Sequence, residues 1–355
     1  MAHATTAAGR LDFLDGVRGV ASLLVVVHHT VEALSREYSI WAHSHVDLGR
    51  LGIVAFFVVS GYVVGLTLSG QSARTFVVRR FWRLYPVYWI TTAIWLTAWL
   101  MLGNPMPAEL GAFAIAVNLT MVQGVIGGWS ILTPAWTLGI EIAFYSQSVA
   151  AKLVRRLHWV SWAGWLWLAA FGVLAMSNLL AGTSYSALVP LLLFTASLGF
   201  ALFRWDVARD RSFWPLLAAA VFIVPLLGMA LGNEPQPGVW PPMGFNVSYL
   251  AGLALFAGFY AIRHVALARP LLWLGGISYS LYLIHLTAIQ LVGHTPLWQI
   301  PIAGPLAAAA LSLALAAVLH RWVERPSTAL GRRRSASGVS RRAAPPRDSD
   351  ARARA

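Results

Sequence analysis

Long apolar runs recur along almost the whole chain, and they constrain the fold more than any other feature of the sequence. Runs of about 20 residues are long enough to cross the hydrocarbon core of a bilayer. Because no water is present there to bind backbone N–H and C=O groups, such runs must form helices. The composition agrees, since 58% of the residues are hydrophobic and only 11% are charged, against about 25% charged in soluble domains. We therefore expect an all-α, polytopic membrane helix bundle.

Charge decides the expected topology. A run at 109–126 is apolar but contains Glu109, Asn118 and Gln123. If it crosses fully, the basic cluster at 152–156 falls outside the cell, whereas every basic cluster falls inside if it is re-entrant or interfacial, as the positive-inside rule requires. We therefore expect about ten transmembrane helices, one re-entrant or interfacial segment and both termini in the cytoplasm. The ten predicted spans are 17–34, 51–69, 86–102, 136–151, 159–180, 185–203, 213–232, 246–262, 271–292 and 302–321.

Composition also bounds the domains and partners. We predict a cytoplasmic N-terminal segment at 1–10, a membrane domain at 11–330 and a disordered basic cytoplasmic tail at 331–355, which contains eight Arg and two Asp. Cytoplasmic loops and this tail account for the net charge of +13, so we expect the lipid bilayer as a partner and no nucleic acid. Arg makes up 25 of the 26 basic residues, which indicates a GC-rich genome and a bacterial plasma membrane. The sequence gives no indication of an oligomeric state.

A polar stripe interrupts the first apolar run. Charge inside a membrane costs a few kcal/mol or more, yet this run contains Asp15, Arg18, His28 and His29. Arg18 and His29 are eleven residues apart and therefore point within about 20° of each other on a helix, with Asp15 and Ser22 on the same face and His28 about 100° away. An imidazole can remove a proton from a hydroxyl group, and an arginine at the inner edge can hold an anion. The alternative is an Asp15–Arg18 pair at a helix end and histidines that bind their neighbours.

Two further segments carry candidate binding groups. Arg80 and Arg83 lie one helical turn apart and can converge on one phosphate, with Arg79 beside them; the alternative is that all three only set the topology. Glu141 lies on one helical face with Thr137 and Tyr145, and a carboxylate in a membrane must be protonated or paired.

Other polar residues have weaker patterns. Ser60 lies in a run whose glycines suit close helix packing, and Tyr282 and His285 share a face with Ser278. Glu324 is expected to pair with a nearby Arg. Cysteine is absent, which excludes disulfides, thiolate metal sites and a cysteine nucleophile; His43 and His45 lack a third ligand, so no metal is expected.

Several of these segments resemble one known family. The stretch LDGVRGVASLLVVVHH, 14–29, is similar to the opening of the acyltransferase 3 family, whose members are integral membrane acyltransferases that modify sugars, cell-envelope glycans and some antibiotics. The spacing of Arg80, Arg83 and Pro86 resembles the second motif of the family. The resemblance extends over 11–330, although the family usually has an acidic residue where Val54 stands. Similar patterns occur at Trp136, Leu138, Glu141, Phe144 and Tyr145, at 275–285 and at 321–326.

The resemblance implies a membrane O-acyltransferase. Such an enzyme, which transfers groups other than aminoacyl groups, would move an acyl group, expected to be acetyl, from acyl-CoA to a hydroxyl of a sugar, an envelope glycan or a glycosylated small molecule. The predicted catalytic residues are His29, Arg18, Glu141 and Asp15, and the predicted acyl-CoA-binding residues are Arg80, Arg83 and Arg79. Residues predicted to contact substrate or to serve in packing are Ser60, Tyr145, Tyr282 and His285.

Two functions from other classes stay open at this point. A transporter or flippase for a glycan or lipid would also need charge within the membrane, although the repeats and broken helices of many transporters are not evident here. A regulatory membrane scaffold would tolerate substitution of the polar stripes.

Overall fold

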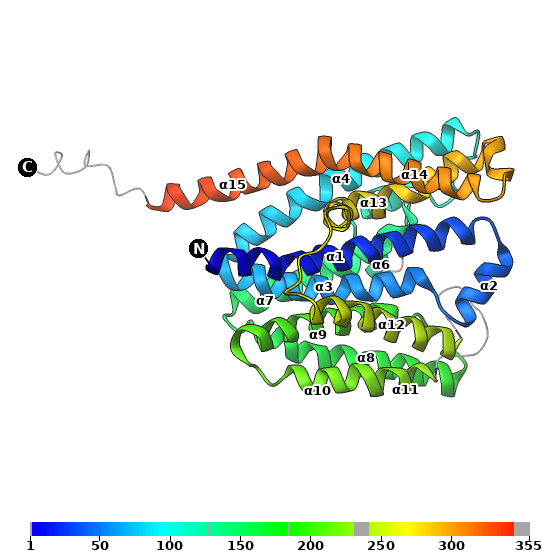
Figure 1. The fold of residues 1–355 in the computed structure, drawn as a ribbon. Helices are drawn as coiled ribbons and strands as arrows, with labels where there is room; N and C mark the ends of the chain where they lie inside the picture. The colour runs from blue at the N-terminus through cyan, green and yellow to red at the C-terminus, as the bar shows by residue number, and fades with distance from the viewer. Residues whose placement is uncertain (1, 127, 184, 231–240, 344–355) are drawn as a thin grey trace, which may run out of the picture.

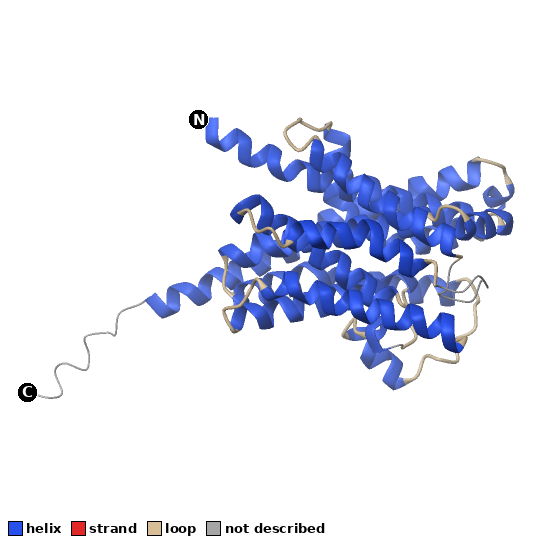
Figure 2. Cartoon of the chain, turned by 90° about the horizontal axis from the view of Figure 1, so that it is seen from below, coloured by secondary structure: helices blue, strands red, loops and turns tan. Residues whose placement is uncertain are grey.

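The computed structural model describes residues 2–126, 128–183, 185–230 and 241–343 of the chain, with side chains from 11 to 336. Within these residues the secondary structure is entirely helical (Figures 1 and 2). The longer helices are α1 (Ala2–Glu32), α3 (Leu48–Gly70), α4 (Ala73–Met101), α7 (Trp136–Leu153), α8 (Trp159–Ala181), α9 (Leu188–Ala208), α12 (Pro242–Ala261), α13 (Arg269–Gly293), α14 (Ala303–Leu319) and α15 (Arg325–Ala343).

Length and hydropathy identify a polytopic membrane bundle, as predicted. Six helical stretches of the described residues are long and apolar enough to cross a bilayer: α3, α8, α9, α12, α13 and the continuous helix 303–336 that includes α14. The other predicted spans fall on α1, α4, α7 and the shorter pair α10 (Phe213–Ala218) and α11 (Val224–Gly228), which a π-helical turn joins. The last two residues of the predicted span 213–232 lie outside the described residues.

The helices lie side by side with their axes nearly aligned (Figure 1). A series of direct contacts runs from α14 to α13, then to α1, α3, α9 and α8. Both described ends of the chain lie at the same end of this bundle, which we call the terminal end, and the short helix α2 (Arg36–Ser44) lies at the opposite end. Apolar side chains such as Leu166 on α8 and Leu306 on α14 are exposed at the periphery, as expected where lipid replaces water.

Helix α3 is central because small residues let its neighbours approach closely. The Cα of Gly61 faces the backbone carbonyl of Ala196 on α9 so closely that a Cβ would collide with it, and Gly199 of α9 meets the carbonyl of Val58 in the same way. Gly52 makes a similar approach to Ala21 of α1. The glycines of this run therefore allow the close helix packing that their spacing suits.

The segment 109–126 forms no continuous helix across the bundle. It contains α5 (Ala112–Leu119) and α6 (Gln123–Ile126), and eight helical residues rise only about 12 Å, less than half of a hydrocarbon core. The side chain of Asn118 bonds the backbone of Trp129 and Ile131 and so closes the segment on itself. This agrees with the prediction of a re-entrant or interfacial segment.

Residues 331–343, which lie in the tail predicted to be disordered, continue α15 in the structure. Gly331 lies against the side chain of Trp82 on α4, and the guanidinium of Arg334 lies 5.0 Å from the centre of the same indole. The Arg79 Nε donates a hydrogen bond to Ser335 Oγ at 3.0 Å. Composition alone indicates a solvated, charged segment, but it carries no information on these contacts with a distant helix. Residues 344–355 lie outside the described residues.

Candidate active site

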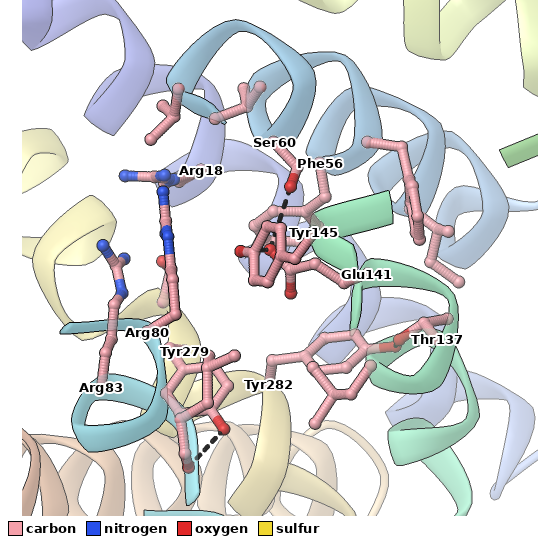
Figure 3. Close-up of a pocket in the computed structure, with 17 residues that line it drawn as sticks. Arg18, Phe56, Ser60, Arg80, Arg83, Thr137, Glu141, Tyr145, Tyr279 and Tyr282 are labelled. Atoms are coloured by element: carbon pink, nitrogen blue, oxygen red, sulfur yellow. Dashed lines mark hydrogen bonds between the residues drawn. The ribbon is translucent and has the colours of Figure 1, made fainter. Parts of the chain in front are cut away.

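A cavity of about 90 Å³ lies inside the bundle among α1, α3, α4, α7 and α13. Its polar lining comes from helices that are far apart in the sequence, and Figure 3 shows how these side chains point toward one space. The polar residues that line it are Arg18, Ser60, Arg80, Arg83, Thr137, Glu141, Tyr145, Ser278, Tyr279 and Tyr282.

Three arginines gather on one side of this cavity (Figure 3). Arg18 comes from α1, and Arg80 and Arg83 come from successive turns of α4. The guanidinium of Arg80 lies 5.1 Å from the ring centre of Phe76 and 4.9 Å from that of Tyr145, so cation–π attraction orients it. The Arg18 side chain is 17% exposed and lies 3.4 Å from the Asp15 carboxylate. The cluster can therefore hold an anion that enters from the terminal end.

Glu141 lies in the middle of the lining and is bound by hydroxyl groups. Its Oε1 accepts a hydrogen bond from Ser60 Oγ at 3.0 Å and another from the hydroxyl of Tyr145. Thr137, Glu141 and Tyr145 all line the cavity, which confirms that they share one face of α7. The expected pairing of Glu141 is thus made with two hydroxyls, and no arginine bonds it among the described residues.

Tyr282 lies across the cavity from the arginines, beside Thr137 (Figure 3). Its hydroxyl donates to the Pro134 carbonyl at 2.9 Å and lies 2.8 Å from Thr137 Oγ1. One turn further along α13, the ring of His285 is 6.2 Å from that of Tyr282 and fully buried. His285 Nδ1 donates to the Tyr282 carbonyl at 2.9 Å, and its Nε2 has no hydrogen-bond partner among the described residues.

His29 lies beyond His285, toward the opposite end of the bundle. The two imidazole rings stack with their centres 5.3 Å apart. His29 Nδ1 lies 3.1 Å from Glu32 Oε2, and a carboxylate at this distance favours the tautomer in which Nδ1 carries the proton and Nε2 is free to accept one. The His29 side chain is 31% exposed. Arg18 therefore lines the cavity, whereas His29 does not, and the rings of Tyr282 and His285 follow one another between the cavity and His29.

A second histidine and two acids complete this outer cluster, which we define as His28, His29, Glu32 and Asp47. His28 Nε2 lies 3.4 Å from Asp47 Oδ1 and 3.7 Å from Glu32 Oε2. Glu32 and Asp47 were not predicted from the sequence; the spacing of Glu32 three residues after His29 was the available signal, whereas Asp47 is the N-cap residue of α3. The ligand atoms of His28, His29 and Glu32 lie within 4.8 Å of one another, close enough to surround a metal ion. Glu32 Oε2 already lies 3.1 Å from His29 Nδ1 and 3.7 Å from His28 Nε2.

The structure separates some of the other predicted residues from the cavity. Arg79 is exposed and bonds Ser335 and Gln71 instead. Val54, where the family usually has an acid, packs against Gly252 of α12. The expected pairing of Glu324 with an arginine is wrong, because its carboxylate accepts from Ser280 Oγ at 2.7 Å and lies 3.0 Å from His320 Nδ1. A buried carboxylate needs only close donors, and Ser280 is nearer than any arginine side chain.

Comparison with known proteins identifies the family. The family model described as an acyltransferase domain matches residues 11–321. The chain belongs to the acyltransferase 3 family. It is therefore a multi-pass membrane acyltransferase, and the resemblance of the sequence motifs is confirmed.

Individual relatives of the acyltransferase 3 family match most of the chain. The acyltransferase MdmB of Streptomyces mycarofaciens is 26% identical, over 92% of this chain and 94% of MdmB. The exopolysaccharide production protein ExoZ of Rhizobium meliloti is 30% identical, over 84% of this chain and 96% of ExoZ. The O-acetyltransferase OatA of Staphylococcus aureus is 24% identical, over 88% of this chain and 56% of OatA. No solved structure matches the chain.

Proposed function

We propose that this acyltransferase moves an acyl group, acetyl in the first instance, from acyl-CoA to a hydroxyl of a sugar, an envelope glycan or a glycosylated small molecule. The observation that carries the proposal is the cavity with three arginines on the side toward the terminal end and, on the other, the successive ring contacts of Tyr282, His285 and His29. We call the cavity and these three side chains together the polar path. Membership of an acyltransferase family favours this function over a transporter, a flippase or a scaffold.

The donor is proposed to enter from the cytoplasm, at the terminal end. Arg18, Arg80 and Arg83 would bind its phosphates, since guanidinium groups suit phosphate oxygens. The positive-inside rule supports this assignment, because the basic clusters at 74–83 and 152–156 then lie on the cytoplasmic side of a bacterial plasma membrane. Asp15 would hold Arg18 in place through their 3.4 Å contact.

The acceptor is proposed to react at His29, in the outer half of the membrane. His29 Nε2 would take the hydroxyl proton as the acceptor oxygen bonds to the thioester carbonyl carbon. The carbon–sulfur bond then breaks, and the CoA thiolate leaves and is protonated. A thioester and an alcohol thus become an ester and a thiol. His29 lies beyond Tyr282 and His285, so the acyl group can reach it in one of two ways. Either the Tyr282 side chain moves away from Pro134 and Thr137 and opens the way, or an enzyme group carries the acyl unit across.

The test is acyl transfer in membranes supplied with labelled acetyl-CoA, followed by mass spectrometry of the cell-envelope glycans. The wild type should acetylate a glycan that membranes without the chain leave unmodified. His29→Ala and Arg18→Ala should each reduce the transfer strongly. Full acetylation by both variants would rule out the proposed site.

A further inference from the structure

A second hollow, of about 270 Å³, opens beside the cavity at the terminal end of the bundle. We call it the basic basin. Three of its basic side chains come from α15 and the π-helical turn η4 (His320–Glu324) that precedes it, a part of the chain that the proposed function does not use. The basin residues that matter here are Arg18, Arg83, His320, Arg325, Thr328 and Arg332.

The charge of the basin is largely uncompensated. Its two acids are already engaged, since Asp15 pairs with Arg18 and Glu324 binds Ser280 and His320. The guanidinium groups of Arg83, Arg325 and Arg332 have no hydrogen bond or ion pair with any described residue. Arginines that face one hollow and have no acidic side chain as a partner there favour the binding of an anion with several charges.

Helix α15 is fixed against α4, so the position of its arginines is defined. Figure 1 shows the two helices lying together, and Gly331, Arg334 and Ser335 make the contacts with α4 described above. Arg325, Thr328 and Arg332 are spaced at i, i+3 and i+7 and therefore share one face of the helix. That face, and not the whole circumference, lines the basin.

The basin continues into the active-site cavity, because Arg18 and Arg83 line both. A ligand that fills both spaces has a multiply charged head and a narrow, less polar arm. Acyl-CoA has this form, with phosphates on its 3′-phosphoadenosine diphosphate head and an acyl-pantetheine arm. We propose that Arg325 and Arg332 of α15 are donor-binding residues: the basic basin binds the nucleotide end of the donor, and the diphosphate next to the pantetheine arm lies at the shared residues Arg18 and Arg83, with Arg80 on the cavity side. The inference rests on the proposed function, which it deepens by assigning the nucleotide end of the donor.

The experiment measures binding, so it does not require the acceptor. Purified protein in nanodiscs of neutral phosphatidylcholine is titrated with CoA, with adenosine 3′,5′-bisphosphate and with S-acetylpantetheine, which lacks the nucleotide. The double variant Arg325→Gln/Arg332→Gln should bind CoA and the bisphosphate about 10- to 100-fold more weakly, the effect of losing charged hydrogen bonds. Its affinity for S-acetylpantetheine should equal that of the wild type.

Arg333→Gln is the matched control, because Arg333 lies on the same helix and carries the same charge but does not line the basin. It should bind all three ligands as the wild type does. The single variants Arg325→Gln and Arg332→Gln, each expected to show part of the loss, replace the double variant if its melting temperature falls.

Each result decides a different claim. Equal CoA affinity in the double variant and the wild type would overturn the role of α15 and leave the proposed function standing. A wild type that binds none of the three ligands would overturn the proposed donor itself. Equal loss for S-acetylpantetheine would show that α15 only supports the fold. An effect that appears only in nanodiscs with anionic phosphatidylglycerol would assign the basin to a lipid headgroup and overturn the proposal.

Discussion

The two ends of the polar path differ in chemistry. Toward the terminal end, Arg18, Arg80 and Arg83 point into the cavity. Of the three, Arg18 alone has an ion pair with a described acid, Asp15. Toward the opposite end, His29 is paired with a carboxylate, and acids outnumber fixed cations in the cluster. The first arrangement suits the binding of an anion, and the second suits the transfer of a proton. In the proposed mechanism, variants at one end should therefore change donor binding and variants at the other should change acceptor activation, although Arg18 and His29 lie on the same helix, α1.

The largest effect should come from His29→Ala. Removal of a general base costs about 10²- to 10⁴-fold in rate, so the transfer from labelled acetyl-CoA should fall by this factor. The affinity for CoA, measured by titration in nanodiscs, should stay unchanged, because His29 does not line the cavity.

His28→Ala and His45→Ala provide the comparison for that variant. His28 contacts Asp47 and the hydroxyl of Tyr38, so its loss should lower the melting temperature more than the rate. His45 is exposed, and its contacts with described residues are local, to the carbonyl and the ring of Trp41 four residues earlier, so its loss should change neither quantity. A rate loss in His28→Ala as large as that in His29→Ala would contradict the assignment of the base.

The next effect should separate two adjacent arginines of α4. Arg80→Gln removes a charged group from the cavity and should raise the KM for acetyl-CoA about 10- to 100-fold, with a smaller change in kcat. Arg79→Gln is the comparison, since Arg79 bonds Ser335 outside the cavity; it acts on the donor only through the position of α15, so its KM should rise less than that of Arg80→Gln. Equal KM values in the two variants would show that the sequence prediction for Arg79 was right and the distinction drawn from the cavity wrong.

The sequence predicted those parts of this architecture that depend on local periodicity. Apolar runs predicted the helices because backbone N–H and C=O groups within a bilayer must bond one another. The four-residue spacing placed Thr137, Glu141 and Tyr145 on one face, and the structure has all three on the cavity. The family motifs likewise selected arginines that do line the cavity, Arg18, Arg80 and Arg83.

The remaining features depend on contacts between distant segments, which periodicity does not encode. Arg79 and Arg80 are neighbours in the sequence, but a helix turns about 100° between them, and the packing of α4 against its neighbours, α15 among them, decides which one faces the cavity. Asp47 reaches His28 across the connection between α1 and α3. Disorder was predicted for the basic tail from its own charged composition. The indole of Trp82 that packs against it lies some 250 residues earlier in the chain, where composition gives no sign of the contact.

A smaller effect should come from Glu32, which we regard as a positioning residue for His29. Glu32→Gln keeps an acceptor oxygen for His29 Nδ1 but removes the charge, and Glu32→Leu removes both. Since hydrogen bonds to charged groups contribute about 1.5–3 kcal/mol, kcat should fall about tenfold in the Gln variant and further in the Leu variant, with the KM for acetyl-CoA constant.

Glu37→Gln tests whether these changes are specific, because Glu37 is an exposed acid that bonds Ser35 on the same side of the bundle. Its kcat should equal that of the wild type. A rise in KM, rather than a fall in kcat, for the Glu32 variants would place Glu32 in donor binding and remove the distinction between the two ends.

The smallest effect should come from Glu141→Gln, which lies between the two ends. The amide retains an oxygen that can accept from Ser60 Oγ and Tyr145, so the site should keep its shape and kcat should fall less than about tenfold. Glu141→Ala leaves both hydroxyls without their acceptor and should destabilise the protein by about 1–3 kcal/mol, seen as a lower melting temperature. In the double variant Glu141→Ala/Ser60→Ala the two losses should not add, because they remove one shared hydrogen bond. A loss of 100-fold or more in Glu141→Gln at an unchanged melting temperature would show instead that the carboxylate itself takes part in the chemistry, and acceptor activation would then belong to the cavity and not to His29.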